Sequence, residues 1–229
     1  MKTCLLLPAY NEAKTVATII GEVRQFIPDI VVIDDGSTDQ TAAQAIEVDR
    51  ICKSTVTVLR HRWNQGKGMA LRTGFDYALS NRFELIATMD TDGQHRPREL
   101  PRLLNHFHCR APDILIGGRI SSDQQSSMPI HRQLNNWLVS AVGSSLCGQR
   151  VPDFQSGFRL IRSTVLQAIQ LETRRYETES ELLIKAGRLG FRIETLSIAT
   201  IYGSETSDIQ TGREIWLFTK LLIKSLQNI

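Results

Sequence analysis

Short apolar runs recur along the first half of the chain, and helical patterns lie between them. The runs cover residues 4–7, 30–33, 55–59, 85–89 and 113–117. Apolar residues at helical spacing fill the intervals 13–26, 40–51, 66–79 and 97–107. Strands that alternate with helices predict an α/β fold, with a mostly parallel central sheet flanked by helices. In such a sheet the loops that follow the strands gather at one edge, where ligands bind.

The fourth apolar run ends in two carboxylates that are one residue apart. Asp90 and Asp92 follow the predicted strand directly, with Thr91 between them. A buried strand that delivers two carboxylates to its end predicts a site for a hard cation and its phosphate ligand, since oxygen ligands suit Mg²⁺ or Mn²⁺. A helix cap is the alternative, but a cap needs one side-chain oxygen rather than two.

Other polar loops are predicted at the same sheet edge. They cover residues 8–12, 34–39 and 66–68, and Arg119 follows the fifth run. One acidic turn would mean little, but five loops at one edge indicate a ligand site.

Composition excludes several classes of protein. The chain of 229 residues has a formal net charge of +3, which is too small to indicate a nucleic-acid partner. Its four cysteines form no C-x-x-C pair, so we expect neither a disulfide framework nor a structural zinc, and we expect a reducing cytoplasm. No run approaches the ~18 apolar residues of a membrane span. Pro8 interrupts the first apolar run before a signal-peptide core could form.

The second half of the sequence differs from the first. Residues 121–128 are rich in Ser and Gln, which predicts a mobile loop, and helices are predicted at 129–148, 164–169 and 177–189. Strands are predicted just after 153–158 and at 191–199. Glu177, Glu179 and Glu181 are expected to form a solvated helix start, where acidic side chains suit the positive helix end. No histidine is expected to cluster with carboxylates, and only His95 lies beside the predicted cation site.

The last segment, residues 212–229, is a predicted amphipathic helix. Apolar residues cover most of it, and Lys220, Lys224 and Gln227 form a narrow polar stripe. It could contact a membrane surface or a small membrane protein. It could equally dock on the rest of the chain, because a core helix shows the same pattern.

An ordered set of motifs carries a family resemblance over nearly the whole chain. The motifs are Pro-Ala-Tyr-Asn-Glu at 8–12, Asp-Asp-Gly-Ser-Thr-Asp at 34–39, Gly-Lys-Gly-Met-Ala at 66–70, Asp-Thr-Asp-Gly-Gln-His-Arg-Pro at 90–97 and Ser-Gly-Phe-Arg at 156–159. In this order the sequence resembles the inverting family 2 glycosyltransferases, and among them the dolichyl- or polyprenyl-phosphate mannosyl- and glucosyltransferases. The resemblance implies one Rossmann-like catalytic domain of the GT-A type over residues 1–229. Residues 1–119 would bind the nucleotide sugar, 120–211 would form the acceptor side, and 212–229 would be the terminal helix.

The resemblance also implies roles for single residues on the donor side. The donor would be a UDP- or GDP-sugar, and the cofactor Mg²⁺ or Mn²⁺. Asp92, with Gln94 and Asp90, would bind the metal, while Asp90 would also contact the ribose or the donor sugar. The remaining residues of the donor pocket would be Pro8, Tyr10, Glu12, Asp35, Lys67 and Thr91.

On the acceptor side, the resemblance implies arginines near the phosphates. These are Arg119, Arg132 and Arg159, and guanidinium groups suit phosphate oxygens. Asp153 could act as a general base, but a lipid phosphate has a second pKa near ~6 and is already ionised at neutral pH. Gln155 departs from the threonine common in the family, and the segment 202–208 lacks a basic residue common in relatives.

We therefore expect a metal-dependent inverting transferase that moves a hexose to a polyprenyl phosphate, at the cytoplasmic face of a membrane. One alternative is a transferase acting on a sugar hydroxyl of a glycan or glycolipid, for which a base such as Asp153 would be required. Two further alternatives are an aspartyl-nucleophile phosphohydrolase and a non-catalytic protein that binds nucleotide sugars.

Overall fold

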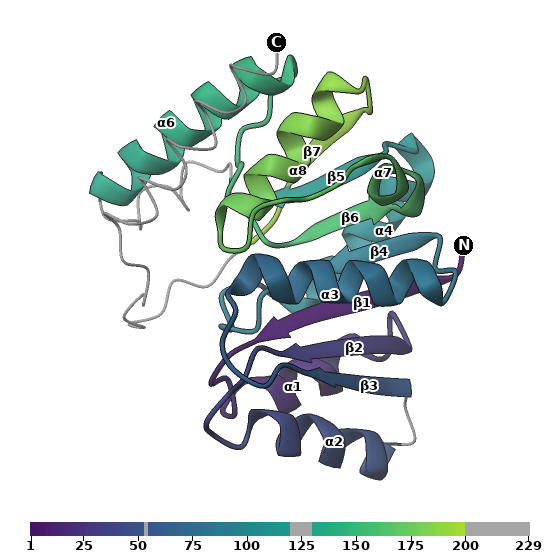
Figure 1. Ribbon diagram of the computed structural model, residues 1–229. Coiled ribbons are helices and arrows are strands. Elements are labelled where there is room, and N and C mark those ends of the chain that lie inside the picture. The colour runs from purple at the N-terminus through teal and green to yellow at the C-terminus, as the bar shows by residue number, and fades with distance from the viewer. Residues whose placement is uncertain (53–54, 120–129, 200–229) are drawn as a thin grey trace.

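The computed structural model describes residues 1–52, 55–119 and 130–199, and Figure 1 shows their arrangement. The predicted terminal helix at 212–229, the predicted mobile loop at 121–128 and the segment 202–208 lie outside these ranges. Within the described ranges, no helix is both long enough and apolar enough to cross a lipid bilayer.

A seven-stranded sheet forms the centre of the molecule, with the strand order β3-β2-β1-β4-β6-β5-β7. Its first half contains β1 (Thr3–Ala9), β2 (Asp29–Asp34), β3 (Thr55–Arg60) and β4 (Leu85–Thr88). These four strands are parallel. Strands β1, β2 and β4 are buried along nearly their whole length, which explains why they are continuous apolar runs rather than alternating ones.

The second half adds three strands, one of which runs against its neighbours. These are β5 (Ile114–Gly118), β6 (Arg159–Arg162) and β7 (Ile193–Ser197). Strand β6 lies between β4 and β5 and is antiparallel to both, while β5 and β7 are parallel. The prediction of a mostly parallel sheet is confirmed. Because β6 is antiparallel, the loop before it arrives at the same edge as the loops after β4 and β5.

Helices cover both faces of the sheet (Figure 1). On one face are α3 (Lys67–Ser80), α6 (Ile130–Cys147), α7 (Ser163–Ala168) and α8 (Glu177–Arg188). Their core includes Leu71, Phe75 and Leu182. On the other face are α1 (Val16–Val23), α2 (Thr41–Cys52), the short 3₁₀ helix η1 (Pro97–Glu99) and α4 (Leu100–Arg110). Ile20, Leu103 and Phe107 belong to that second core.

Helix α1 begins three residues later than the sequence pattern predicts. Asn11 has a φ of 58°, and the backbone amides of Thr15 and Val16 both donate to the Glu12 carbonyl. Residues 11–15 therefore form a turn, which leaves the polar groups after β1 at the sheet edge.

Candidate active site

The loops after β1 and β4 are joined by hydrogen bonds at the carboxyl edge of the sheet. The Thr91 hydroxyl donates to the Pro8 carbonyl at 2.9 Å. The Thr15 hydroxyl donates to the Thr91 carbonyl at 2.6 Å and lies 3.0 Å from a Glu12 carboxylate oxygen. Three of the residues predicted for one pocket are therefore connected: Pro8 contacts Thr91 directly, and Thr15 links Thr91 to Glu12.

Asp90 is held by a lysine from the start of α3. Lys67 Nζ lies 2.6 Å from Asp90 Oδ1, and His95 Nε2 lies 3.7 Å from Oδ2. Gly157 packs so closely that a Cβ atom there would stand 2.5 Å from Asp90 Cγ. Burial acts to raise the pKa of Asp90, but the charge of Lys67 and the proximity of His95 hold it well below its usual range. Asp90 is thus a charged carboxylate in a fixed orientation.

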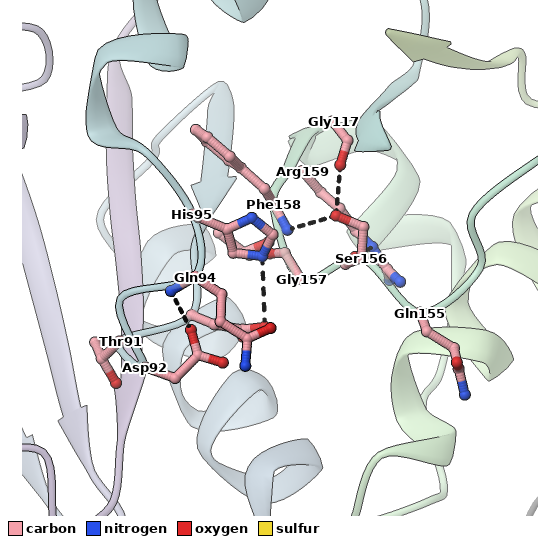
Figure 2. Close-up of polar contacts among 12 residues, drawn as sticks. Thr91, Asp92, Gln94, His95, Gly117, Gln155, Ser156, Gly157, Phe158 and Arg159 are labelled. Carbon is pink, nitrogen blue, oxygen red and sulfur yellow. Dashed lines mark hydrogen bonds and ion pairs between the residues drawn. The ribbon is translucent and has the colours of Figure 1, made fainter. Parts of the chain in front are cut away.

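Asp92 differs from Asp90 because no cationic side chain pairs with it among the described residues. The backbone amide of Gln94 donates to its Oδ1 at 2.9 Å (Figure 2). Burial and the neighbouring charge of Asp90 raise the pKa of the Asp92 carboxyl. A divalent cation would relieve this excess of negative charge, so the oxygen donors of Asp92 and Gln94 fit Mg²⁺ or Mn²⁺.

The protein alone offers few ligands to such a cation. In residues 1–52, 55–119 and 130–199, no three His, Cys, Asp or Glu side chains gather as a metal site. Mg²⁺ is commonly held by one or two carboxylates together with substrate phosphates. The donor set therefore fits a cation that arrives with a phosphate ligand.

Asp35 directly follows β2 and is almost fully buried. It accepts hydrogen bonds from the backbone amides of Gln65 and Gly66, at 2.9 and 2.8 Å. His61 Nδ1 lies 2.6 Å from Asp35 Oδ1, and His61 Nε2 lies 2.9 Å from the Thr73 hydroxyl. The expectation that histidines avoid carboxylates was therefore wrong. His61 follows β3, and β2 and β3 are parallel neighbours, so only the sheet order brings the two side chains together.

The other residues predicted for the nucleotide pocket lie in the turn after β1. Pro8 is buried, Glu12 is half-buried and Tyr10 is 43% exposed. The backbone amide of Glu12 donates to the Thr41 hydroxyl at 2.8 Å. Tyr10 is therefore the most exposed of these three side chains.

Arg119 and Asp153 form a closed pair. Arg119 Nε donates to Asp153 Oδ2 at 2.8 Å, and Arg119 Nη2 donates to Oδ1 at 3.0 Å. The backbone amide of Arg119 also donates to Asp153. Burial acts to raise the pKa of Asp153, but Arg119 holds it below the usual value. A carboxylate with two guanidinium contacts and a lowered pKa is a weak general base.

Arg159 is buried beneath the site. Its guanidinium donates to the carbonyl oxygens of Ser156, Phe154 and Glu179 at 2.8, 2.9 and 3.0 Å. The Ser156 hydroxyl in turn bonds to the Gly117 carbonyl and the Phe158 amide (Figure 2). Arg159 therefore supports the loop before β6. Arg132 belongs to α6, but its side chain lies outside the described part of the structure.

The acidic start of α8 is buried, so the expectation of a solvated helix start was wrong. Glu179 Oε2 lies 3.0 Å from Lys67 Nζ. Glu181 accepts the backbone amides of Glu172 and Thr173. The spacing carried a signal for this: residues two apart point about 200° apart around a helix, so Glu177 and Glu179 could not share one solvated face.

Residues 4–170 match the family model described as Glycosyl transferase family 2. An undecaprenyl-phosphate mannosyltransferase from Micrococcus luteus is 30% identical over 88% of this chain and 84% of its own length. A UDP-N-acetylglucosamine–dolichyl-phosphate N-acetylglucosaminyltransferase from Methanococcus voltae is 30% identical over 86% of this chain and 85% of its own length.

A solved structure has the same fold. Glucosyl-3-phosphoglycerate synthase from Mycobacterium tuberculosis, crystallised with Mn²⁺, UDP and phosphoglyceric acid, superposes with a TM-score of 0.70 at 19% identity. The match covers 99% of this chain and 78% of the other. The predicted GT-A fold is confirmed by this likeness.

Proposed function

Because the chain belongs to glycosyl transferase family 2, we propose that it moves a hexose, with inversion, from a nucleotide-sugar donor to a polyprenyl phosphate. The donor is a UDP- or GDP-sugar and the reaction needs Mg²⁺ or Mn²⁺. Family membership excludes the aspartyl-nucleophile phosphohydrolase. The names of the Micrococcus and Methanococcus relatives support a lipid-phosphate acceptor.

The observation that carries the donor side is the unequal state of Asp90 and Asp92. Lys67 pairs with the charged Asp90 carboxylate, whereas Asp92 has a raised pKa because it is buried beside the negative charge of Asp90. A divalent cation at Asp92 would stabilise the negative charge that gathers on the departing nucleoside diphosphate. Asp90, whose orientation Lys67 fixes, is then free to accept hydrogen bonds from the ribose or the donor sugar through Oδ2.

The nucleotide would lie along the edge formed by β1, β2 and β4. Pro8, Tyr10 and Glu12 would line one wall. Asp35 would contact the base or ribose, with His61 keeping its carboxylate in place at 2.6 Å. Lys67 would act on the donor through Asp90 rather than as a direct phosphate ligand, since Asp90 and Glu179 both contact its ammonium group.

The acceptor needs no base in this mechanism. A phosphate monoester is largely ionised at neutral pH, because its second pKa is about 6, and its oxygen can attack the anomeric carbon directly. The lowered pKa of Asp153 supports a different role, in which Asp153 holds Arg119 at the end of β5. Arg119 and Arg132 would then face the phosphates, and Arg159 would shape the loop beneath them.

A polyprenyl phosphate resides in a membrane, so we propose that the enzyme works at the cytoplasmic membrane face. Residues 212–229 are the candidate contact with lipid or with a small membrane protein. In this proposal, residues 1–119 mainly bind the donor and residues 120–211 mainly bind the acceptor. Both parts contribute strands to one sheet.

Ligand-dependent stability tests the donor side. Mn²⁺ with the correct nucleotide sugar should raise the melting temperature, because a ligand of the native state stabilises it by mass action. Asp92→Ala should abolish the shift. Asp76→Ala removes an exposed carboxylate of α3 and should leave it unchanged. The proposal fails if no UDP- or GDP-sugar shifts the parent, or if the Asp92 variant responds as the parent does.

The acceptor is tested by comparing a short polyprenyl phosphate with the corresponding polyprenol. Only the phosphate should be glycosylated. Transfer to the polyprenol or to a sugar hydroxyl at a similar rate would favour the hydroxyl-acceptor alternative, which needs a base.

A further inference from the structure

We infer that Arg174 and Arg175, in the loop between α7 and α8, bind phosphate oxygens of a substrate. The inference rests on the proposed function and adds a phosphate-binding element to its site. It begins from a pattern in the sequence, where two arginines at 174–175 precede the three glutamates of α8. Arginines and glutamates three to four residues apart would be expected to form ion pairs with one another.

The side chains of these glutamates contact other groups instead. Glu181 accepts two backbone amides of the loop and lies 2.6 Å from Lys185 Nζ. Glu179 pairs with Lys67 at 3.0 Å. Glu177 lies 3.4–3.5 Å from the backbone amides of residues 174 and 175. No carboxylate in the described ranges forms an ion pair with the guanidinium of either arginine, so both positive charges stay uncompensated there.

The same contacts fix the loop against the donor side of the site. The Met69 amide donates to the Arg174 carbonyl at 2.9 Å. A Cβ atom on Gly66 would stand 2.9 Å from Arg175 Cγ, so the stem of Arg175 lies against the residue whose amide binds Asp35. The backbone of both arginines is thus held in place before any ligand binds.

The loop also lies close to the charged centre of the site. The Tyr176 ring lies over Lys67, with the ammonium 5.7 Å from the ring centroid, and Lys67 contacts Asp90 at 2.6 Å. Arg174 is exposed and Arg175 is half-buried. The loop that carries both arginines therefore lies beside Gly66, which binds Asp35, and Lys67, which binds Asp90, at the edge where phosphate groups are expected.

Two other arginines near the site already form hydrogen bonds within the protein. Arg119 is paired with Asp153, and Arg159 bonds to three backbone carbonyls. A planar guanidinium group can donate two parallel hydrogen bonds to two oxygens of one phosphate. The phosphate can belong to the donor diphosphate or to the acceptor monoester, and both present the same oxygens.

Charge removal tests the inference in the full chain. The variants are Arg174→Gln, Arg175→Gln and the double variant. Arg82→Gln is the matched control, because Arg82 is an exposed arginine just beyond the opposite end of α3. Calorimetry measures the Kd of UDP or GDP with Mn²⁺, and a transfer assay measures KM for a short polyprenyl phosphate.

The double variant should raise either the nucleotide Kd or the acceptor KM by about tenfold or more, as expected for the loss of charge-assisted hydrogen bonds. A weaker nucleotide Kd assigns the arginines to the donor, and a raised acceptor KM assigns them to the acceptor. The inference is overturned if the parent is active and both constants of the double variant stay within twofold of it, or if Arg82→Gln has an equal effect. A parent that neither binds nucleotide nor transfers sugar overturns the proposed function as well.

Discussion

Replacement of Arg159 by lysine separates a supporting role from a phosphate-binding one. The guanidinium uses three different nitrogens to reach the carbonyls of Ser156, Phe154 and Glu179. A lysine keeps the positive charge but has a single nitrogen, which cannot occupy three separate positions. We therefore expect Arg159→Lys to leave one or two buried carbonyls without a donor.

The magnitude follows from the number of lost partners. A buried polar group without a partner costs about 2 kcal/mol, the middle of a range of about 1–3, so one or two such carbonyls should lower the free energy of unfolding by about 2–4 kcal/mol. Small domains are stable by about 5–15 kcal/mol, which means that the variant should fold and be measurable. Arg159→Met would lose all three bonds and the charge near Glu179, so lysine is the more informative change.

The assay is equilibrium unfolding in urea, followed by circular dichroism. Arg162→Lys is the control, because Arg162 lies on the same strand but is half-exposed and donates to one carbonyl, that of Pro112. The control should lose less than about 1 kcal/mol. If Arg159→Lys were as stable as the control yet had a raised KM for a phosphate substrate, the supporting role would be refuted and Arg159 would be a phosphate ligand.

Two further predictions concern close contacts of the site. Gly157→Ala should lower the free energy of unfolding by about 1–3 kcal/mol, because the added Cβ overpacks the site. It should also weaken nucleotide binding, because that Cβ would displace the Asp90 carboxylate. An unchanged nucleotide affinity, measured by calorimetry, would contradict this prediction. Asp153→Asn should destabilise the protein at neutral pH by about 3 kcal/mol, since it removes the buried negative charge that Arg119 contacts. The pKa of Asp153 is lowered in the folded state, so its contribution is present above the unfolded pKa of about 3.9 and is lost as pH falls through the folded pKa. Unfolding curves of parent and variant should therefore converge in acid, and a gap that stays constant with pH would contradict the pairing.

Much of the fold could be predicted because its strands carry a local signal. A strand buried on both faces is a continuous apolar run, and β1, β2 and β4 are such runs. Asp90 and Asp92 could be placed at the sheet edge because they directly follow β4. The direction of β6 has no local signal, since its four residues Arg159–Arg162 would form a strand equally well either way.

The missed contacts all depend on which elements become neighbours. His61 reaches Asp35 only because β3 lies beside β2. Glu179 reaches Lys67 only because α8 packs near the start of α3. A local pattern predicted a solvated acidic helix start, and the tertiary structure uses the same carboxylates to fix a lysine and a loop.

The charges around Asp90 explain why the metal and the diphosphate should bind together. Lys67 and Arg159 face Asp90 and Glu179, with Lys67 at 2.6 and 3.0 Å from the two carboxylates and Arg159 at 4.0 Å from Glu179. These four charges balance, so Asp92 is left as the carboxylate available to a cation. One carboxylate with one amide side chain binds Mg²⁺ or Mn²⁺ weakly, because such ions require about six ligands. A nucleoside diphosphate supplies further oxygens but also repels the uncompensated charge of Asp92. Each ligand therefore removes the obstacle to the other, and by linkage the cation must raise the affinity for the diphosphate by the same factor as the diphosphate raises the affinity for the cation.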